Sequence, residues 1–535
     1  MSKNHEYWAV EGSERTVLPG AKAIGRANSN ATIEVTLKLR RMKALPPLTG
    51  RPDRTITRAD LSNEYGASQA DIDKVIETFR KYDLEIVESD PGTRTVRLRG
   101  SISAMENAFQ VKLFNYSHDT HSYRGRVGPV HVPVACKDIV EGVFGLDNRQ
   151  VAHRKQVGSH RNPQFSSVQS SWYLPNELAK HYNFPDGDGA GQAVALLEFG
   201  GGYFEDDLKQ FCDLANISTP PKVIPISVDG ISTNSNDDAT GEVMLDIEVV
   251  AGVCPKSNIV VYFARWGEQG WLRALDSAIH DQRNDPGVIS ISWGYAEDVD
   301  IWTRQAMNQV NEALAEAARI GVTVCVATGD DGSSDGEPDG HAHTDFPSSS
   351  PYVLAVGGTA IPSKGSTQPD IVWMEGSGIR RTFGGSTGGG VSAVFSRPEW
   401  QKDITIESVN PGAIIGRCIP DLAANADANA SPYTIVVGGQ AHGYGGTSAS
   451  SPLVAGLLTL INASRPPSKR VGYLTPILYQ NNDSGSTTVG QSVCTDVQSG
   501  NNNTDQLGGY DAGLGYDAAS GWGTPDGRKL ARAIP

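Results

Sequence analysis

The chain has 535 residues, 39% hydrophobic and 20% charged, which fits a globular protein too long for one ordinary core. No stretch reaches the roughly 18 consecutive apolar residues of a membrane span. Residues 1–165 carry 25 Lys and Arg against 19 Asp and Glu, whereas the remainder carries 21 against 42. We therefore expect a basic and an acidic part that attract each other at neutral pH, and an acidic part that binds nucleic acid poorly.

The first 152 residues have the pattern of a small α+β domain. Alternating apolarity predicts strands and helical spacing predicts helices, in the order strand, helix, strand, helix, strand, at 32–40, 70–82, 94–99, 101–109 and 110–116. The polar stretch 153–171 has no apolar period and is interpreted as an exposed linker.

From residue 172 onwards, short and wholly apolar runs alternate with helical segments. The runs are 194–199, 259–264, 288–293, 323–328 and 352–358. Continuous apolarity is typical of strands covered on both faces, so we predict a parallel α/β sheet with helices on each side. Ligands of such sheets bind at the carboxyl ends of strands, where Glu198, Trp293 and Asp330 stand.

Neither the N-terminus nor the cysteines give a strong signal. The first twenty residues lack the apolar segment of a secretory signal, so they do not indicate export. The six cysteines are far apart and form no C-x-x-C pair, so we do not expect stability to depend on disulfides.

Ser448 is a candidate nucleophile. It lies in GGTSASSP (445–452), just before a buried-helix pattern, where free N–H groups and the helix dipole favour an oxyanion. The flanking glycines allow a substrate backbone to approach closely. The alternative interpretation is an ordinary N-cap serine.

Glu242 and Asp246 stand four residues apart in the apolar helix predicted at 241–251, so they share one face. Crowded carboxylates share a proton, which suits general-base work in acid, where a histidine would be protonated. The alternative is a solvated acidic face. Asp330 follows the strand at 323–328, and once protonated it could donate a hydrogen bond to an oxyanion; a calcium-binding or turn loop is its alternative.

Together these motifs resemble the sedolisin family of serine-carboxyl peptidases, especially its kumamolisin branch. The similar segments span about 172–525 and include GEVMLDIEVVAG (241–252), ATGDDGSSDGEPDG (327–340) and GGTSASSP (445–452). The resemblance implies a subtilisin-like parallel sheet with helices on both faces, preceded by a ferredoxin-like α+β activation domain. It places the activation domain at 1–152, a linker with the processing site at 153–171 and the peptidase domain at 172–535.

By this resemblance Glu242 is the general base, Asp246 its partner, Ser448 the nucleophile, and Asp330 part of the oxyanion hole with the Ser448 N–H group. It also implies that Glu198 and Trp293 lie beside the catalytic carboxylates, and that Asp345 lines the substrate cleft. One departure is Asp331, an acid where the family usually has serine, which affects the local proton affinity and leaves the role of Asp330 intact.

The resemblance further implies one structural calcium ion near the C-terminus. Carboxylates of Asp496 and Asp517 and backbone carbonyls of Val497, Gly513 and Gly515 would supply hard oxygen ligands. Two ordinary Gly/Asn-rich turns are the alternative. The remaining implications are a secreted monomer that acts on protein and peptide substrates, is inhibited by its own activation domain, and binds no membrane or nucleic acid.

Two rivals remain open at this point. A neutral subtilisin-type protease would need a histidine base, and none of the histidines beyond the linker stands in a suitable motif. A catalytically silent homologue that acts as a binding module should lack at least one of the four site residues, and none is missing.

Overall fold

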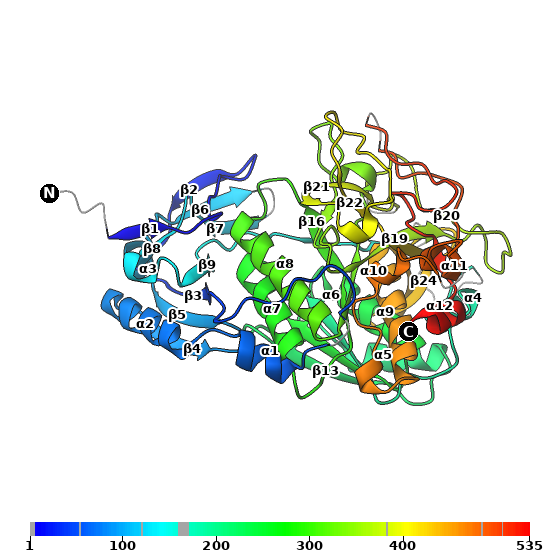
Figure 1. Cartoon of the computed structure of the whole chain (residues 1–535), viewed down its shortest axis with the longest axis horizontal. Coiled ribbons are helices and arrows are strands. Elements are labelled where there is room, and N and C mark those ends of the chain that lie inside the picture. The colour runs from blue at the N-terminus through cyan, green and yellow to red at the C-terminus, as the bar shows by residue number, and fades with distance from the viewer. Residues whose placement is uncertain are drawn as a thin grey trace.

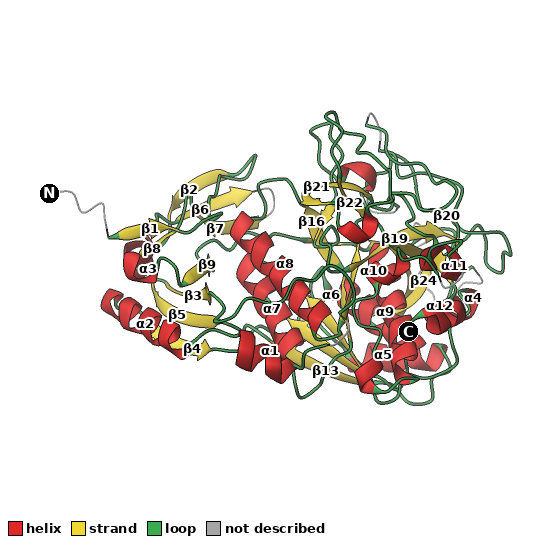
Figure 2. Ribbon diagram, in the orientation of Figure 1, coloured by secondary structure: helices red, strands yellow, loops and turns green. Residues whose placement is uncertain are grey.

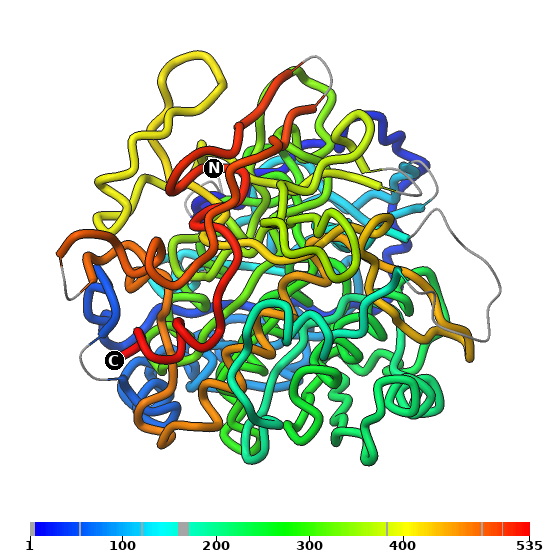
Figure 3. The backbone as a smooth tube through the Cα atoms, turned by 90° about the vertical axis from the view of Figure 1, so that its right-hand side faces the viewer, coloured from blue at the N-terminus to red at the C-terminus, as the bar shows by residue number. Residues whose placement is uncertain are grey.

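The computed structural model describes residues 6–52, 55–118, 121–158, 171–380, 384–482, 485–504 and 507–535. The first part of the chain, blue in Figure 1, lies beside a larger α/β unit that contains the rest. The C-terminal segment, red in Figure 3, runs across the side of this larger unit that is opposite the first part.

The N-terminal part is built on a four-stranded antiparallel sheet in the order β4-β5-β3-β9, with helices α2 and α3 packed on it. Both helices begin at serine N-caps, Ser68 and Ser101, whose side chains accept backbone N–H groups of the first turn. The elements are β3 (Thr32–Leu39), α1 (Arg58–Tyr65), α2 (Gln69–Phe79), β4 (Glu85–Asp90), β5 (Thr95–Ser101), α3 (Ile102–Phe109) and β9 (Val140–Phe144).

A second, smaller antiparallel sheet of this part has the order β2-β6-β7. Its strands are β2 (Lys22–Arg26), β6 (Phe114–His118) and β7 (His121–Gly125), and a short pair joins β1 (Tyr7–Ala9) to β8 (His131–Pro133). The strand predicted at 110–116 therefore begins only at residue 114. The predicted α+β class is confirmed, while β4, β9, α1 and every strand of the two short sheets except β6 were not anticipated.

The larger unit contains a mostly parallel eight-stranded sheet with the order β13-β14-β12-β15-β17-β19-β20, and β23 also pairs with β19. All five apolar runs contribute strands to this sheet. The run 288–293 divides into β15 and β16 (Trp293–Ala296), and β16 pairs with β18 (Asp345–Phe346) in a separate small sheet. The strands of the large sheet are β12 (Ala193–Glu198), β13 (Lys222–Ser227), β14 (Asn258–Phe263), β15 (Val288–Ile291), β17 (Thr323–Ala327), β19 (Leu354–Ala360), β20 (Ile371–Val372) and β23 (Leu422–Asn425).

Helices cover both faces of this sheet, as predicted (Figure 2). One core packs α4, α5, α6 and α9 against it, and a second core packs α7 and α8 against the opposite face. The helices are α4 (Pro175–His181), α5 (Glu205–Leu214), α6 (Thr240–Val253), α7 (Glu268–His280), α8 (Arg304–Arg319), α9 (Thr447–Ala463), α10 (Thr475–Leu478), α11 (Val489–Val493) and α12 (Gly527–Ala533).

All six cysteines are buried and unpaired. Over the described ranges, none of the helices combines the length and the apolar character needed to cross a membrane.

Candidate active site

Ser448 is fully buried in the first turn of α9. The N-cap of this helix is Gly446, with φ of 95°, so the interpretation of Ser448 as an N-cap serine is wrong. A Cβ atom at residue 446 would lie 2.3 Å from the Lys155 carbonyl oxygen and 2.7 Å from Asp330 Oδ2. Only glycine therefore allows both groups to approach the helix N-terminus so closely.

Glu242 and Asp246 both project from α6 into the protein, and each is 0% exposed. The interpretation of a solvated acidic face is therefore wrong. Burial raises the pKa of Glu242 well above its ordinary value, and the Asp246 charge raises it further, whereas the Ser448 side chain favours ionised Glu242. Neither Glu242 oxygen has a hydrogen-bond partner of ordinary geometry within the described residues.

The carboxylate pair is part of a buried cluster of three acids. Ser292 Oγ donates to Asp246 Oδ1 and Oδ2 at 3.0 and 2.8 Å, and Trp293 Nε1 donates to Glu198 Oε2 at 3.0 Å. Burial and the neighbouring charge raise the pKa values of Asp246 and Glu198 well above the ordinary range. The carboxyl groups of this cluster therefore bind protons more strongly than ordinary carboxyl groups do, at a position next to Ser448.

Asp330, three residues after the end of β17, is also fully buried and turns toward the N-terminus of α9. Its Oδ1 accepts the Thr447 N–H group at 2.8 Å and the Thr447 hydroxyl at 2.9 Å. Its Oδ2 lies 4.0 Å from Arg380 Nη1 and has no hydrogen-bond partner in the part of the chain that the structure describes. Burial raises the pKa of Asp330 to about 7, against the opposing effect of Arg380. A protonated Oδ2 would thus be a free donor beside the Ser448 N–H group.

Lys155 and Val157 are buried, so the expectation that the linker is exposed is wrong for these two residues, whereas His153 is exposed as expected; residues 159–170 fall outside the described residues. The strand β10 (His153–Arg154) pairs antiparallel with β16, and β11 (Val157–Gly158) pairs antiparallel with β25 (Gln440–Gly445). No local pattern predicts this pairing, because the segment is polar and lacks alternation.

Asp345 is buried, and its ion-pair partner is a residue that sequence reasoning missed. Lys155 Nζ lies 2.5 Å from Asp345 Oδ2 and 3.5 Å from Asp335 Oδ1. The Lys155 N–H group donates to the Ser292 carbonyl at 3.0 Å, and its carbonyl accepts the Ser448 N–H group at 2.9 Å. The linker backbone therefore lies against the N-terminus of α9 at Ser448.

Comparisons with known proteins identify the family of the chain. Residues 19–149 match the family model described as the Pro-kumamolisin activation domain, and residues 228–496 match the subtilase family. The chain is 38% identical to kumamolisin from Bacillus sp. (strain MN-32), an alignment that covers 100% of this chain and 98% of that protein. The chain belongs to the sedolisin family of serine-carboxyl peptidases.

Other members of the sedolisin family match over much of the chain. Sedolisin from Pseudomonas sp. (strain 101) is 28% identical, covering 95% of this chain and 88% of that protein. The solved structure of Pseudomonas sedolisin in complex with pseudo-iodotyrostatin has a TM-score of 0.58 at 29% identity, covering 69% of this chain and 99% of that one. The chain is thus a serine-carboxyl peptidase precursor with its activation domain and a subtilisin-like fold.

Asp331, the departure from the sedolisin pattern, binds a neighbouring loop. Its Oδ1 accepts the Arg380 N–H group at 2.7 Å, and its Oδ2 lies 3.4 Å from Arg380 Nη2. The Asp331 charge raises the pKa of Asp330, whereas Arg380 lowers it. The extra acid and its arginine thus act in opposite directions on Asp330.

The two C-terminal loops expected to bind calcium lie next to each other. The Gly515 N–H group donates to Asp496 Oδ2 at 3.2 Å, and the Gly513 N–H group donates to Asp517 Oδ2 at 3.1 Å. Among the described residues, no group of three or more His, Cys, Asp or Glu side chains is placed to hold a metal. Two carboxylates with backbone carbonyls remain a donor set of the hard oxygens that Ca²⁺ prefers.

Proposed function

We propose that this sedolisin-family precursor is an acid-acting endopeptidase in which Ser448 is the nucleophile, Glu242 the general base and Asp246 its partner. The observation that carries the proposal is the buried acid cluster at Ser448, since carboxylates with raised pKa values can exchange protons in acid. Glu198 and Trp293 support the cluster by extending its proton-holding network away from solvent.

The proposed reaction begins when Ser448 Oγ adds to the substrate carbonyl carbon and its proton passes to Glu242. The oxyanion accepts hydrogen bonds from the Ser448 N–H group and from protonated Asp330. When the intermediate collapses, the leaving amine takes the proton from Glu242, and water then hydrolyses the acyl-enzyme in the reverse sequence. Because the pKa of Asp330 is raised to about 7, this donor is present in acid and lost in alkali.

The rival mechanism of a neutral subtilisin-type protease finds no support at this position. The helix that faces Ser448 carries Glu242 and Asp246, and no histidine lies on it. The rival of a silent binding module is also disfavoured, because Glu242 and Asp330 both lie beside the first turn of α9, which carries Ser448.

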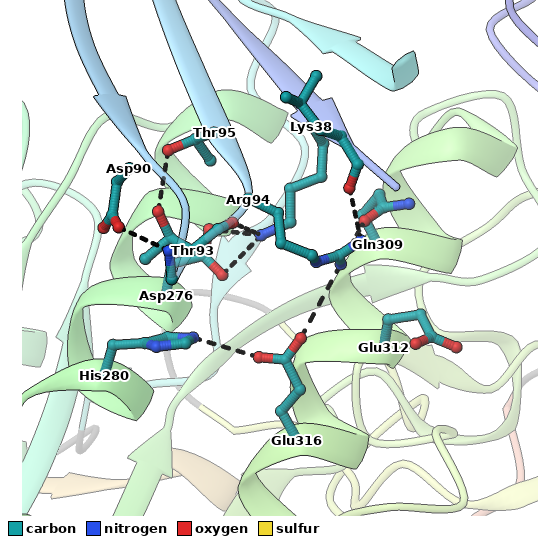
Figure 4. A network of polar contacts seen from close by, with 12 residues as sticks. Lys38, Asp90, Thr93, Arg94, Thr95, Asp276, His280, Gln309, Glu312 and Glu316 are labelled. Atoms are coloured by element: carbon teal, nitrogen blue, oxygen red, sulfur yellow. Dashed lines mark hydrogen bonds and ion pairs between the residues drawn. The ribbon is translucent and has the colours of Figure 1, made fainter. Parts of the chain in front are cut away.

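The activation domain is proposed to inhibit the enzyme through charge as well as through the linker. Three buried interface pairs each join a cation of the activation domain to a carboxylate of the catalytic part: Lys38–Asp276, Arg15–Glu268 and Arg94–Glu316 (Figure 4 draws the first and third). This polarity agrees with the opposite net charges of the two parts and favours their docking.

We also propose one structural Ca²⁺ ion held by carboxylates of Asp496 and Asp517 and by carbonyls of Val497, Gly513 and Gly515. The ion would join two loops that are separate in sequence, and thereby stabilise the native state by mass action. Secretion, a monomeric state and action on protein and peptide substrates complete the proposal; they rest on family membership.

The test is a comparison of three variants at pH 3–8 with denatured protein as substrate. Ser448→Ala and Glu242→Gln should abolish hydrolysis and leave the precursor at full length. Glu248→Gln is the matched control, because Glu248 is equally buried on the same helix but accepts the Val436 N–H group, away from Ser448. Activity that survives in Ser448→Ala, or that peaks above pH 7 in the wild type, would contradict the proposal.

A further inference from the structure

A cavity of about 730 Å³, here called the seam cavity, opens between the activation domain and the catalytic part. One wall comes from β3, β5, β7 and residues 145–148, and the other from residues 228–230 and the start of α7. The two walls touch beside it, since Gln269 Nε2 of α7 donates to Thr36 Oγ1 of β3 at 2.9 Å. Its volume is within the roughly 300–1,000 Å³ of small-molecule sites.

Arginine side chains from both walls line the seam cavity. They are Arg97, Arg99 and Arg124 of the activation domain and Arg265 and Arg273 of the catalytic part. Three carboxylates line it with them, those of Glu34, Asp147 and Asp229. Five guanidinium groups against three carboxylates leave an excess of two positive charges, which favours an anionic ligand.

Glu34 is shared by the two arginines of β5. Arg97 Nη2 lies 2.6 Å from Glu34 Oε2, and Arg99 Nη2 lies 2.7 Å from Glu34 Oε1. Each arginine has one further carboxylate outside the cavity, Glu88 for Arg97 and Glu85 for Arg99, and both of these glutamates are exposed. Because exposed ion pairs are weak, both guanidinium groups remain available to another anion.

The other two carboxylates are also bound by arginines. Asp147 accepts from Arg149 Nε and Nη2 at 3.0 and 2.8 Å, and Asp229 pairs with Arg273. Burial lowers the pKa of Arg273, and the charge of Arg97 on the opposite wall lowers it further, whereas Asp229 raises it. The cations of the two walls therefore repel each other across the cavity, and an anion between them would remove this repulsion.

Two arginines, one on each wall, have no carboxylate at ion-pair distance within the described residues. Arg124 Nε and Nη2 donate to the carbonyls of Leu146 and Gly145 at 3.0 and 2.7 Å, and burial lowers the pKa of Arg124. The Arg265 side chain is exposed and lines the cavity without a hydrogen-bond partner in the part of the chain that the structure describes. Both have donors left for a ligand.

The guanidinium group selects the chemistry of this ligand. Its planar fork matches two oxygens of one phosphoryl group, so several arginines around a cavity suit a phosphate with more than one group. Phosphoryl groups also keep negative charge in acid, whereas carboxylates take up protons near pH 4. An oligophosphate thus stays multivalent in the acidic medium in which the enzyme is proposed to act.

We propose that the seam cavity binds a small oligophosphate, and that this ligand holds the activation domain on the catalytic part. Because each wall supplies only some of the arginines, the ligand binds the docked precursor more tightly than either separated part, and it therefore favours docking by mass action. The site itself does not depend on the proposed catalytic mechanism; its effect on maturation rests on the proposed function.

The first experiment is calorimetric titration of sodium tripolyphosphate into the full-length precursor at pH 7 and low salt. Wild type should show one saturable site, and Arg265→Met should weaken binding about tenfold or more, since one charge-assisted contact is lost. Arg283→Met is the matched control and should bind like wild type, because Arg283 is also exposed in the catalytic part but does not line the cavity. No saturable binding at millimolar tripolyphosphate, or equal affinity in Arg265→Met, would overturn the inference.

The second experiment tests whether both walls are needed. Mature enzyme, from which the activation domain has been released, retains only Arg265 and Arg273 of the five arginines, so it should bind tripolyphosphate at least about tenfold more weakly than the precursor. Arg124→Met in the precursor should weaken binding similarly, with the Tm measured to confirm folding. Equal affinity of precursor and mature enzyme would refute a ligand that bridges the two parts.

The third experiment follows maturation of the precursor in acid by gel electrophoresis. Tripolyphosphate at ten times its Kd should lengthen the half-time of wild type by about tenfold, and it should leave Arg265→Met unchanged. An unchanged half-time in wild type would contradict the effect on docking. A precursor that never matures would defeat the proposed function alone, because the calorimetric result still decides whether the site exists.

Discussion

The buried pair Lys38–Asp276 offers a quantitative test of how the activation domain is held. Lys38 Nζ donates to both Asp276 oxygens, at 2.9 and 2.8 Å, and to the Thr93 carbonyl at 2.8 Å. The two side chains are 3% and 7% exposed. Lys38→Met would leave Asp276 buried in the complex without a cation, which costs about 3–5 kcal/mol. At 1.4 kcal/mol per tenfold change, docking should weaken by about 10²- to 4 × 10³-fold.

The assay is the inhibition constant of residues 1–158, supplied as a separate chain, against mature enzyme at pH 6.5. This segment has a hydrophobic core of its own and should fold alone. Lys43→Met is the matched control, because its pair with Glu64 is more than half exposed and lies within the activation domain. A change of less than tenfold for Lys38→Met would refute the argument that buried charge pairs hold the domain.

The same assay at lower pH tests how acid releases the domain. Burial alone would raise the pKa of Glu316, but the His280 hydrogen bond and the charges of Arg41 and Arg94 lower it well below 4.5. A lowered carboxyl pKa in the complex means that this stabilisation is complete above about pH 4.5 and is lost as pH falls through the lowered value. Inhibition through this group should therefore stay nearly constant from pH 7 to 5 and weaken only below about 4.5. Loss between pH 7 and 5 would assign release to other groups.

Three further predictions concern the catalytic part. The activity of the wild type should fall as pH rises through about 7, where Asp330 loses its proton. Asp330→Asn cannot ionise, so its pH–rate profile should lack this fall. If the fall is unchanged in Asp330→Asn, Asp330 is not the donor. Asp517→Ala should lower the Tm by several degrees and abolish the effect of a calcium chelator on the Tm, whereas wild type without a chelator response would argue against a structural ion. Arg417→Met should destabilise the fold by about 3–5 kcal/mol in denaturant unfolding, because it leaves the buried Asp421 carboxylate without its cation; a loss below about 1 kcal/mol would contradict this.

The sequence alone determined the fold class and the proposed catalytic residues. Wholly apolar runs such as 194–199 and 323–328 predict buried parallel strands, since burial on both faces removes the need for alternation. Likewise, two acids four residues apart in an apolar helix must share a face, so their spacing is enough to pair Glu242 with Asp246. Such local patterns predict the tertiary fold because apolar residues must be buried in the core.

Only the tertiary structure decided what surrounds those residues. The edge strand β13 has half-exposed residues, and β23 is only four residues long, so neither has a strong local pattern. The register of residues 153–158 depends on backbone hydrogen bonds to β16 and β25. Because such bonds do not depend on which side chains are present, the sequence does not specify this register. Lys155, Asp335 and Asp345 meet across gaps of up to 190 residues, and a charge pair of this kind leaves no periodic trace in sequence. The fold determines this pairing, because it brings carboxylates that are distant in sequence next to the Lys155 ammonium group.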